Sequence, residues 1–261
     1  MDYLKRNTDI SNKVLEDLKK HKDVEGVMFL GGVARGYADV DSDIDIAVFS
    51  KKKLTWLSLG ENFDANNIDL EFFNIKMEDD NNEWDEACKE AYYEGKIVFD
   101  RNGLVKKFID EKLFYSDEEF QYNYCYHIFH LAWHGFIYTP YRNKNIRGYS
   151  WVLPNDLWVR RGPIENGYFV LQKCAGIFIE SLFTLNKRWA PDFKWIYRKS
   201  LTLPYLPTDY KKKMDFILFS EFNKENYYKK LQYMQEMLDE CFEKVSSLLP
   251  ENMYKLIDEY E

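Results

Sequence analysis

The sequence has few cysteines, and their spacing excludes the usual zinc and disulfide frameworks. Cys88, Cys125, Cys174 and Cys241 are far apart, and none belongs to a Cys-x-x-Cys motif. Scattered thiols of this kind are typical of reduced, mostly buried cysteines. We therefore expect four reduced thiols and no structural zinc site.

The sequence also lacks long apolar runs, a signal-peptide pattern and an excess of positive charge. No stretch approaches the roughly 18 to 20 apolar residues that span a bilayer, and the first residues show no signal-peptide pattern. The net charge is −8 and the pI is about 5.2. Such a chain repels nucleic-acid phosphates and attracts cations. We expect a cytoplasmic protein with neither nucleic acid nor a membrane as its partner.

The composition allows one large domain or two modest ones in 261 residues. Hydrophobic residues make up 46% of the chain, enough for a sizeable core, while 31% are charged. Aromatic residues reach 18%, and most of them follow Tyr92. The second half should therefore contain an aromatic-rich core or pocket.

The most informative stretch is residues 27–49, which reads VMFLGGVARGYADVDSDIDIAVF. An apolar strand is expected before the Gly31-Gly32 pair, and a second strand carries Asp43 and Asp45. Side chains two apart in a strand share a face, so these two carboxylates should converge and favour a divalent metal. Glycines let the backbone approach phosphate oxygens. Together these features indicate chemistry on a nucleoside triphosphate.

The same residues resemble the signature of the DNA polymerase beta nucleotidyltransferase superfamily. Residues 31–36 read GGVARG and residues 42–46 read SDIDI, as in its small-molecule and minimal branches. The resemblance implies phosphate or nucleotide contacts from Gly31, Gly32, Arg35 and Ser42. Gly32 stands where the superfamily more often has a serine that contacts the triphosphate, which bears on nucleotide affinity.

The superfamily also needs a third carboxylate on a neighbouring strand. Residues 68–73 read IDLEFF, in which Asp69 matches the family position and Glu71 lies on the same strand face. Asp69 is therefore the expected third catalytic and metal-binding residue, with Glu71 as the alternative metal ligand. The resemblance implies that Asp43 and Asp45 bridge two Mg²⁺ ions.

The implied reaction is transfer of a nucleoside monophosphate, AMP from ATP in the first instance, to a hydroxyl of a small molecule. The acidic charge and the many aromatic residues favour a cationic acceptor such as an aminosugar. Two alternatives stay open. One is AMP transfer to a protein, as in toxin–antitoxin pairs, and the other is a nucleotide-binding sensor without turnover.

The pattern along the chain predicts an α+β fold with two domains. Residues 1–103 should form the nucleotidyltransferase core, a small mixed sheet with helices. Its first helix is expected to begin at a cap on Asp9 or Ser11 and to end near His21. The other expected elements are strands at 27–30, 44–49, 68–75 and 96–99 and a helix at 83–93.

Residues 104–261 are expected to form a helical bundle that binds the acceptor. Long helices are predicted at 117–138 and 167–186, and a heptad-like helix at 231–248. The irregular stretch 139–166 contains three prolines and five basic residues, and long loops of this kind are often functional.

Residues 185–195 resemble a stretch of an uncharacterised helical domain that accompanies nucleotidyltransferase cores. The resemblance implies a helical domain that closes the cleft and selects the acceptor. Basic residues of such a domain neutralise a triphosphate, and Lys173, Arg188 and Lys194 are the candidates for nucleotide binding.

Three histidines share one predicted helix face, because His127, His130 and His134 are spaced by three and four residues. Such a face could bind a transition metal. No nearby carboxylate or cysteine completes a tetrahedral set, and the neighbours are aromatic. We therefore interpret them as core or pocket-wall histidines.

Overall fold

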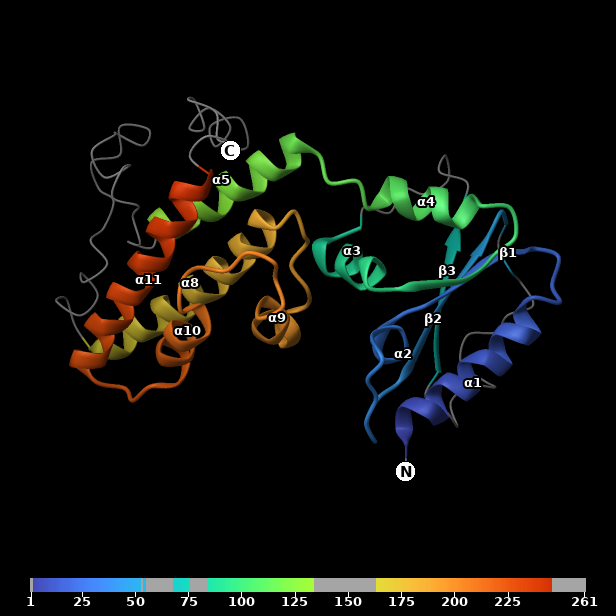
Figure 1. Cartoon of the computed structure of the whole chain (residues 1–261), viewed down its shortest axis with the longest axis horizontal. Coiled ribbons are helices and arrows are strands. Elements are labelled where there is room, and N and C mark those ends of the chain that lie inside the picture. Colours follow the sequence, from blue (N-terminus) through green and yellow to red (C-terminus); the bar gives the residue numbers. More distant parts are fainter. Residues whose placement is uncertain (1, 53, 55–67, 76–83, 134–162, 246–261) are drawn as a thin grey trace. The chain divides into compact units, whose positions relative to one another are not determined.

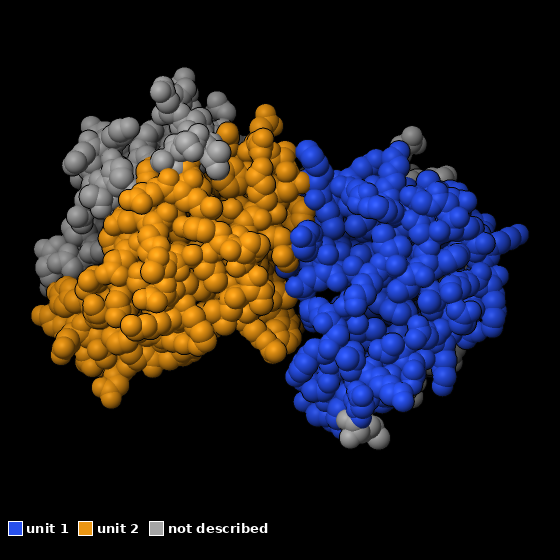
Figure 2. Space-filling view, viewed as in Figure 1, with its two compact units in different colours: residues 1–114 blue, residues 115–261 orange. Residues whose placement is uncertain are grey.

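The structure is a computed structural model that describes residues 2–52, 54, 68–75, 84–133 and 163–245. The chain divides into two compact units, Met1–Phe114 and Tyr115–Glu261 (Figure 2). The first unit contains a sheet with helices, and the described part of the second contains helices only. The expected α+β class, with a helical part after a sheet-containing core, is confirmed.

The first unit is built on a four-stranded mixed sheet in the order β3-β2-β1-β4 (Figure 1). β1 pairs antiparallel with both β2 and β4, whereas β2 and β3 run parallel. Each strand overlaps one that its apolar residues predict. The strands are β1 (Val24–Phe29), β2 (Ile44–Ser50), β3 (Ile68–Asn74) and β4 (Lys96–Asp100).

Helices cover both faces of this sheet (Figure 1). α1 (Tyr3–Leu18) packs on the face that carries Ile44, Ile46 and Val48, the even-numbered residues of β2. α3 (Glu86–Tyr93) and α4 (Leu104–Lys112) pack on the opposite face, where Ala47 and Phe49 lie. Because strand residues alternate between faces, Asp45 belongs to the α3 side.

α1 begins earlier than the sequence pattern predicts. The carboxylate of Asp2 accepts a hydrogen bond of 3.0 Å from the Lys5 backbone N–H and caps the helix. Ser11 is buried inside the helix, where its hydroxyl donates to the Asn7 carbonyl oxygen at 2.8 Å. The predicted cap at Asp9 or Ser11 is therefore wrong. Serine can bond back to the preceding helical turn as well as cap a helix start.

The first unit extends beyond the domain boundary expected after residue 103. α4 follows Gly103 and buries Val105, Phe108 and Ile109 in one cluster with Phe49 and the α3 side chains. This apolar stripe ties α4 to the sheet, and the first unit ends at Phe114.

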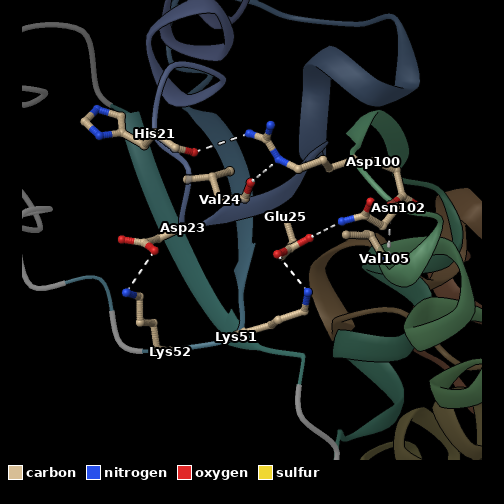
Figure 3. A network of polar contacts seen from close by, with 10 residues as sticks. His21, Asp23, Val24, Glu25, Lys51, Lys52, Asp100, Asn102 and Val105 are labelled. Carbon is tan, nitrogen blue, oxygen red and sulfur yellow. Dashed lines mark hydrogen bonds and ion pairs between the residues drawn. The ribbon is translucent and has the colours of Figure 1, made fainter.

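A polar network holds the end of β1 at Val24, which is remote from Gly31 and Gly32 (Figure 3). Glu25 is buried, and its carboxylate pairs with Lys51 at 3.0 Å and accepts from the Asn102 side-chain amide at 2.9 Å. Arg101 donates to the backbone carbonyls of Val24 and His21 at 3.3 and 3.4 Å. The network joins segments that adjoin β1, β2 and β4.

The second unit packs its helices around α8 (Ile164–Leu185), which buries residues such as Leu171, Phe178 and Leu182. Helices α5 and α11 and the shorter helix α10 contribute to the same core. The predicted loop at 139–166 falls mainly on residues 139–162, which lie outside the described part. The other described helices are α5 (Asp117–Trp133), α9 (Phe193–Ser200), α10 (Tyr210–Phe219) and α11 (Lys224–Val245).

α8 is the one helix in the described part of the chain that is long and apolar enough to cross a membrane. Its length and apolar character contradict the expectation that no stretch of the chain approaches a bilayer-spanning length. However, 56% of its most apolar window is buried inside the protein. α8 therefore contributes a large part of its surface to the core of the second unit.

Candidate active site

The glycine pair opens a short helix, α2 (Gly31–Arg35), and the segment from Gly31 to Gly36 is called the glycine turn below. Leu30 precedes the helix and cannot cap it with a side-chain hydrogen bond. The helix ends at Gly36, whose φ of 76° lies in the left-handed region that glycine adopts without strain. The backbone N–H groups of the first turn are therefore not capped by the side chain that precedes them.

The close contact with β2 allows no side chain at position 31. Its φ is +52°, and a Cβ atom built on it would lie 1.8 Å from the Asp45 Oδ2 atom. The backbone around this contact is also fixed, because the Leu30 N–H donates to the Asp45 carbonyl at 3.0 Å. A glycine is the residue that permits the carboxylate to lie this close to the turn.

The local backbone also explains why residue 32 is a glycine. A Cβ atom on Gly32 would lie 2.5 Å from the Tyr37 carbonyl oxygen, and the Tyr37 N–H donates to the Gly32 carbonyl at 3.0 Å. A serine in this position would collide with the backbone of the loop. The path of the backbone at residues 36–43 therefore accounts for a glycine at position 32, where the superfamily more often has a serine.

That loop is held by its own side chains. The Ser42 hydroxyl donates to the Asp39 carboxylate and accepts from the Asp39 N–H, at 3.0 and 2.9 Å. Tyr37 donates to the same carboxylate at 2.9 Å, and these bonds hold the pKa of Asp39 below its usual value. Ser42, a predicted nucleotide contact, thus uses its hydroxyl to shape the turn before Asp43.

The carboxylates lie on the α3 side of the sheet. Asp45 and Asp69 are directly opposite each other in the parallel pairing of β2 and β3, and Glu71 is opposite Ala47. Alternation puts Asp69 and Glu71 on the same face, while Asp43 immediately precedes β2. Asp43, Asp69 and Glu71 are exposed, whereas Asp45 is mostly covered.

Asp45 has a strongly perturbed carboxyl group. Burial and, to a smaller extent, the negative charges of Asp43, Asp69 and Glu71 together raise its pKa from 3.8 to about 6. The nearby charge of Arg35 acts in the opposite direction. The four acids and Arg35 are therefore electrostatically coupled, and this coupling is expected of a site that binds cations.

Glu71 is distinguished from Asp69 by a partner on α3. The buried Tyr92 hydroxyl donates a hydrogen bond to the Glu71 Oε2 atom, and burial followed by the Glu71 charge raises the pKa of Tyr92. No sequence pattern indicated a role for Tyr92. Its only signal was an aromatic residue on the helix that follows β3, which is too general to indicate this contact.

Arg35 lies at the end of α2, where its guanidinium Nη1 atom is 3.5 Å from the Glu94 Oε2 atom. The side chain is partly exposed, and its charge reaches Asp45. This position is compatible with the predicted phosphate contact. Such a contact would compete with the Glu94 pair, which is long for a charged hydrogen bond.

The donor chemistry fits a hard divalent cation such as Mg²⁺. The acids offer carboxylate oxygens, and their mutual repulsion at Asp45 would be relieved by positive charge. Among the described residues, no three acidic, histidine or cysteine side chains converge tightly enough to enclose a metal. Side-chain rotation of Asp43 and Asp69 would be needed to bring their oxygens to one ion.

Comparison with known families identifies this part of the chain. The family described as "Polymerase beta, Nucleotidyltransferase" matches residues 12–103. Residues 12–103 are a polymerase beta nucleotidyltransferase domain. The matched range includes α2 and strands β1 to β4, so the glycine turn and all four acids belong to this domain.

The chain is similar to a solved crystal structure, that of a nucleotidyltransferase-like protein from Exiguobacterium sibiricum 255-15. The identity is 11% and the TM-score 0.41, over 92% of this chain and 77% of that chain. No curated protein matches the chain. The family assignment therefore depends on the nucleotidyltransferase domain alone.

The basic residues predicted to bind the triphosphate belong to the second unit, outside the nucleotidyltransferase domain. Lys173 is on α8, Lys194 is in the first turn of α9, and the Arg188 N–H donates to the Phe183 carbonyl at 2.9 Å. Contact of these three residues with a nucleotide stays a prediction. In the same segment the buried Trp189 packs against the Tyr115 ring.

The predicted histidine face is on α5. His127 is buried, and His130 packs edge-on against the Tyr126 ring with centroids 4.3 Å apart. His134 lies outside the described residues. His127 and His130 both line one pocket of the helical unit, in keeping with their interpretation as pocket-wall residues.

Proposed function

We propose that the chain transfers a nucleoside monophosphate, AMP from ATP in the first instance, to a hydroxyl of a small molecule and releases pyrophosphate. The observation that carries this proposal is the joint placement of Gly31, Asp45 and Asp69. The glycine turn touches the Asp45 carboxylate, and Asp45 is paired with Asp69 across β2 and β3.

In this reaction the acceptor hydroxyl oxygen forms a bond to the α-phosphorus of the nucleotide. The bond from that phosphorus to the bridging oxygen breaks, and pyrophosphate leaves with the electron pair. The exposed Asp69 is the proposed acceptor of the hydroxyl proton, because a carboxylate within hydrogen-bond reach can serve as a general base. No covalent intermediate with the protein is required.

The protein would contribute mainly position and charge. Gly31 and Gly32 let the triphosphate approach the backbone of α2, and Arg35 would exchange its Glu94 contact for a phosphate oxygen. Asp43, Asp45 and Asp69 would hold two Mg²⁺ ions, which when bound supply positive charge for the phosphates and the attacking hydroxyl. Positioning and charge stabilisation of this kind are effective in phosphoryl transfer.

Asp69 is preferred over Glu71 as the third carboxylate. Its register places it directly beside Asp45, whereas the Glu71 carboxylate accepts a hydrogen bond from Tyr92. In this proposal Glu71 helps to position α3 against the strand and adds negative charge to the site.

The test is to incubate the protein with Mg²⁺, one of the four ribonucleoside triphosphates and a panel of cationic and neutral hydroxyl compounds. Pyrophosphate release together with a nucleotide mass gain on one compound is the expected result. Asp45→Asn serves as the matched control and should release none. Mass gain on a protein alone, or nucleotide binding without turnover, would overturn the small-molecule assignment.

A further inference from the structure

The helical unit contains a pocket of about 740 Å³. Residues of α5, α8, α9 and α10 line it, and its volume is within the range of about 300–1,000 Å³ usual for small-molecule sites. Most of the lining is aromatic or aliphatic. The aromatic members are Tyr126, Phe169, Phe193, Tyr197 and Phe219.

Three phenylalanines around this pocket are unusually exposed. Phe169 on α8, Phe193 on α9 and Phe219 on α10 expose 78%, 81% and 70% of their surface. Single exposed apolar residues are common on proteins, but several around one concavity mark a binding site. These rings offer flat apolar faces to a ring-shaped ligand.

His127 supplies an independent sign of a ligand. It lines the pocket and is only 6% exposed, yet neither ring nitrogen has a hydrogen-bond partner among the described residues. Burial, with a smaller effect of His130, lowers its pKa to about 4, so the imidazole is neutral near pH 7. Buried polar groups without partners are rare in native proteins, and a ligand group would satisfy this one.

The charges in the pocket indicate which ligand group lies beside His127. The Glu180 Oε2 atom is 3.8 Å from the His127 Nδ1 atom, too far for a hydrogen bond but close enough to share a ligand donor. Lys173 also lines the pocket, about 10 Å along α8 from Glu180 at 1.5 Å per residue. The His127–Glu180 end therefore favours an amine or hydroxyl, and the Lys173 end disfavours a cation.

We propose that this pocket binds a small molecule that combines a flat apolar ring with an amine or hydroxyl group. The ring lies against the exposed phenylalanines, and the polar group lies between His127 and Glu180. The proposal concerns the helical unit alone and does not depend on nucleotidyl transfer by the first unit.

Gly176 provides a way to fill the pocket without disturbing its wall. It lies on α8 in the pocket lining, and a Cβ atom built on it would meet no atom within 4 Å. Gly176→Ala should therefore fold at least as well as the wild type, because alanine favours helices more than glycine does. Gly176→Leu places a larger group in the same space. Thermal unfolding of both variants verifies that α8 remains folded.

Tyramine is a suitable probe, because it joins an aromatic ring to an ammonium and a phenol group. Calorimetry should show saturable binding to the full chain, weakened by Gly176→Ala and abolished by Gly176→Leu. Loss of the charged contact in Glu180→Gln should weaken binding about tenfold. Glu165→Gln, on the same helix but outside the pocket lining, should leave it unchanged.

The analogue 3-phenylpropionate keeps the aromatic ring but has neither an amine nor a hydroxyl group. It should bind more weakly than tyramine, because it lacks the donor that lies between His127 and Glu180. Absence of saturable tyramine binding to the wild type would overturn the proposal. So would unchanged binding to a folded Gly176→Leu variant, or binding of the propionate as tight as that of tyramine.

Discussion

The Oδ2 atom of Asp45 lies 1.8 Å from the point that a Cβ atom of residue 31 would occupy. The glycine turn and the acidic strand therefore form one packed arrangement. Any side chain at position 31 must displace the carboxylate or the backbone of α2. A change in one of these parts should consequently be measurable in the other.

Gly31→Ala should lower nucleotidyl transfer by at least about 100-fold, equivalent to about 2.7 kcal/mol of transition-state stabilisation. The new methyl group would collide with Asp45, and alanine is strained at a φ of +52°. Gly36→Ala is the matched control, because its φ is +76° but no atom lies within 4 Å of the added Cβ.

This control should lose about 1 kcal/mol of folding stability from backbone strain and keep most of its activity. Initial rates and chemical denaturation measure the two effects. Equal activity in the two variants would show that the Asp45 contact does not matter.

Asp45→Asn should stabilise the protein in EDTA at pH 8 while it removes activity. The pKa of Asp45 is raised to about 6 by burial and by the neighbouring acids. The stability that this carboxyl contributes is therefore present when it is protonated, below about pH 4, and is lost as the pH rises through 6. The difference of about 2 pKa units allows a gain of up to about 3 kcal/mol in the variant.

Urea denaturation between pH 4 and 8 tests whether the stability gain of Asp45→Asn increases with pH. The stability difference between variant and wild type should be small at pH 4, grow between pH 4 and pH 6, and level off above pH 6. A difference that shrinks with rising pH would contradict the assigned pKa direction. Asp17→Asn, near the end of α1, is a control of opposite sign, because it loses an exposed pair with Lys20 and should not gain stability as the pH rises.

Glu25→Gln should lower the free energy of unfolding by about 1–2 kcal/mol near pH 7, because it weakens the contact between the buried Glu25 carboxylate and the half-exposed Lys51 side chain. The hydrogen bond from Lys51 is the largest cause that holds the pKa of Glu25 below 4.5. This stabilisation is therefore present above pH 4.5 and is lost as the pH falls. Lys52→Ala breaks the more exposed pair with Asp23 and should cost less (Figure 3).

Thermal unfolding at pH 7 and pH 3.5 checks both variants. The deficit of Glu25→Gln relative to the wild type should decrease at the lower pH. A deficit independent of pH would mean that packing, rather than the ionised carboxylate, stabilises this end of the sheet.

The strands of the nucleotidyltransferase domain could be predicted because their apolar runs are short and end at polar residues. The runs around Val27, Ile46 and Leu70 each became a strand, and the two-residue spacing of Asp69 and Glu71 put both side chains on one face of β3. The family signature supplied the rest of the expected site. These features depend on residues close together in the sequence.

Features set by distant contacts could not be predicted. α2 is a helix rather than an open turn, and its glycines are fixed by Asp45 and by the Tyr37 carbonyl. The bond from Tyr92 to Glu71 joins residues 21 positions apart. The pocket around His127 needs four helices, so the histidine spacing alone did not show which ligand it could take.

Asp69→Asn should reduce turnover by at least about 1,000-fold, whereas Glu71→Gln should keep it within about tenfold of the wild type. Asp69 is opposite Asp45 in the strand register, and Glu71 accepts a hydrogen bond from Tyr92. Tyr92→Phe removes only the hydroxyl and should affect stability more than catalysis. Its folding free energy should fall by about 1–2 kcal/mol, because the buried bond is lost.

Single-turnover rates with saturating ATP and Mg²⁺ separate these variants, and calorimetry of nucleotide binding shows whether the site is still occupied. A large rate loss in Glu71→Gln with a mild effect in Asp69→Asn would reverse the assignment. Tyr92→Phe then decides the remaining question. If Glu71 were the third metal ligand, loss of the Tyr92 hydroxyl would release the Glu71 carboxylate and change the dependence of the rate on Mg²⁺ concentration. If Asp69 is the ligand, that dependence should match the wild type.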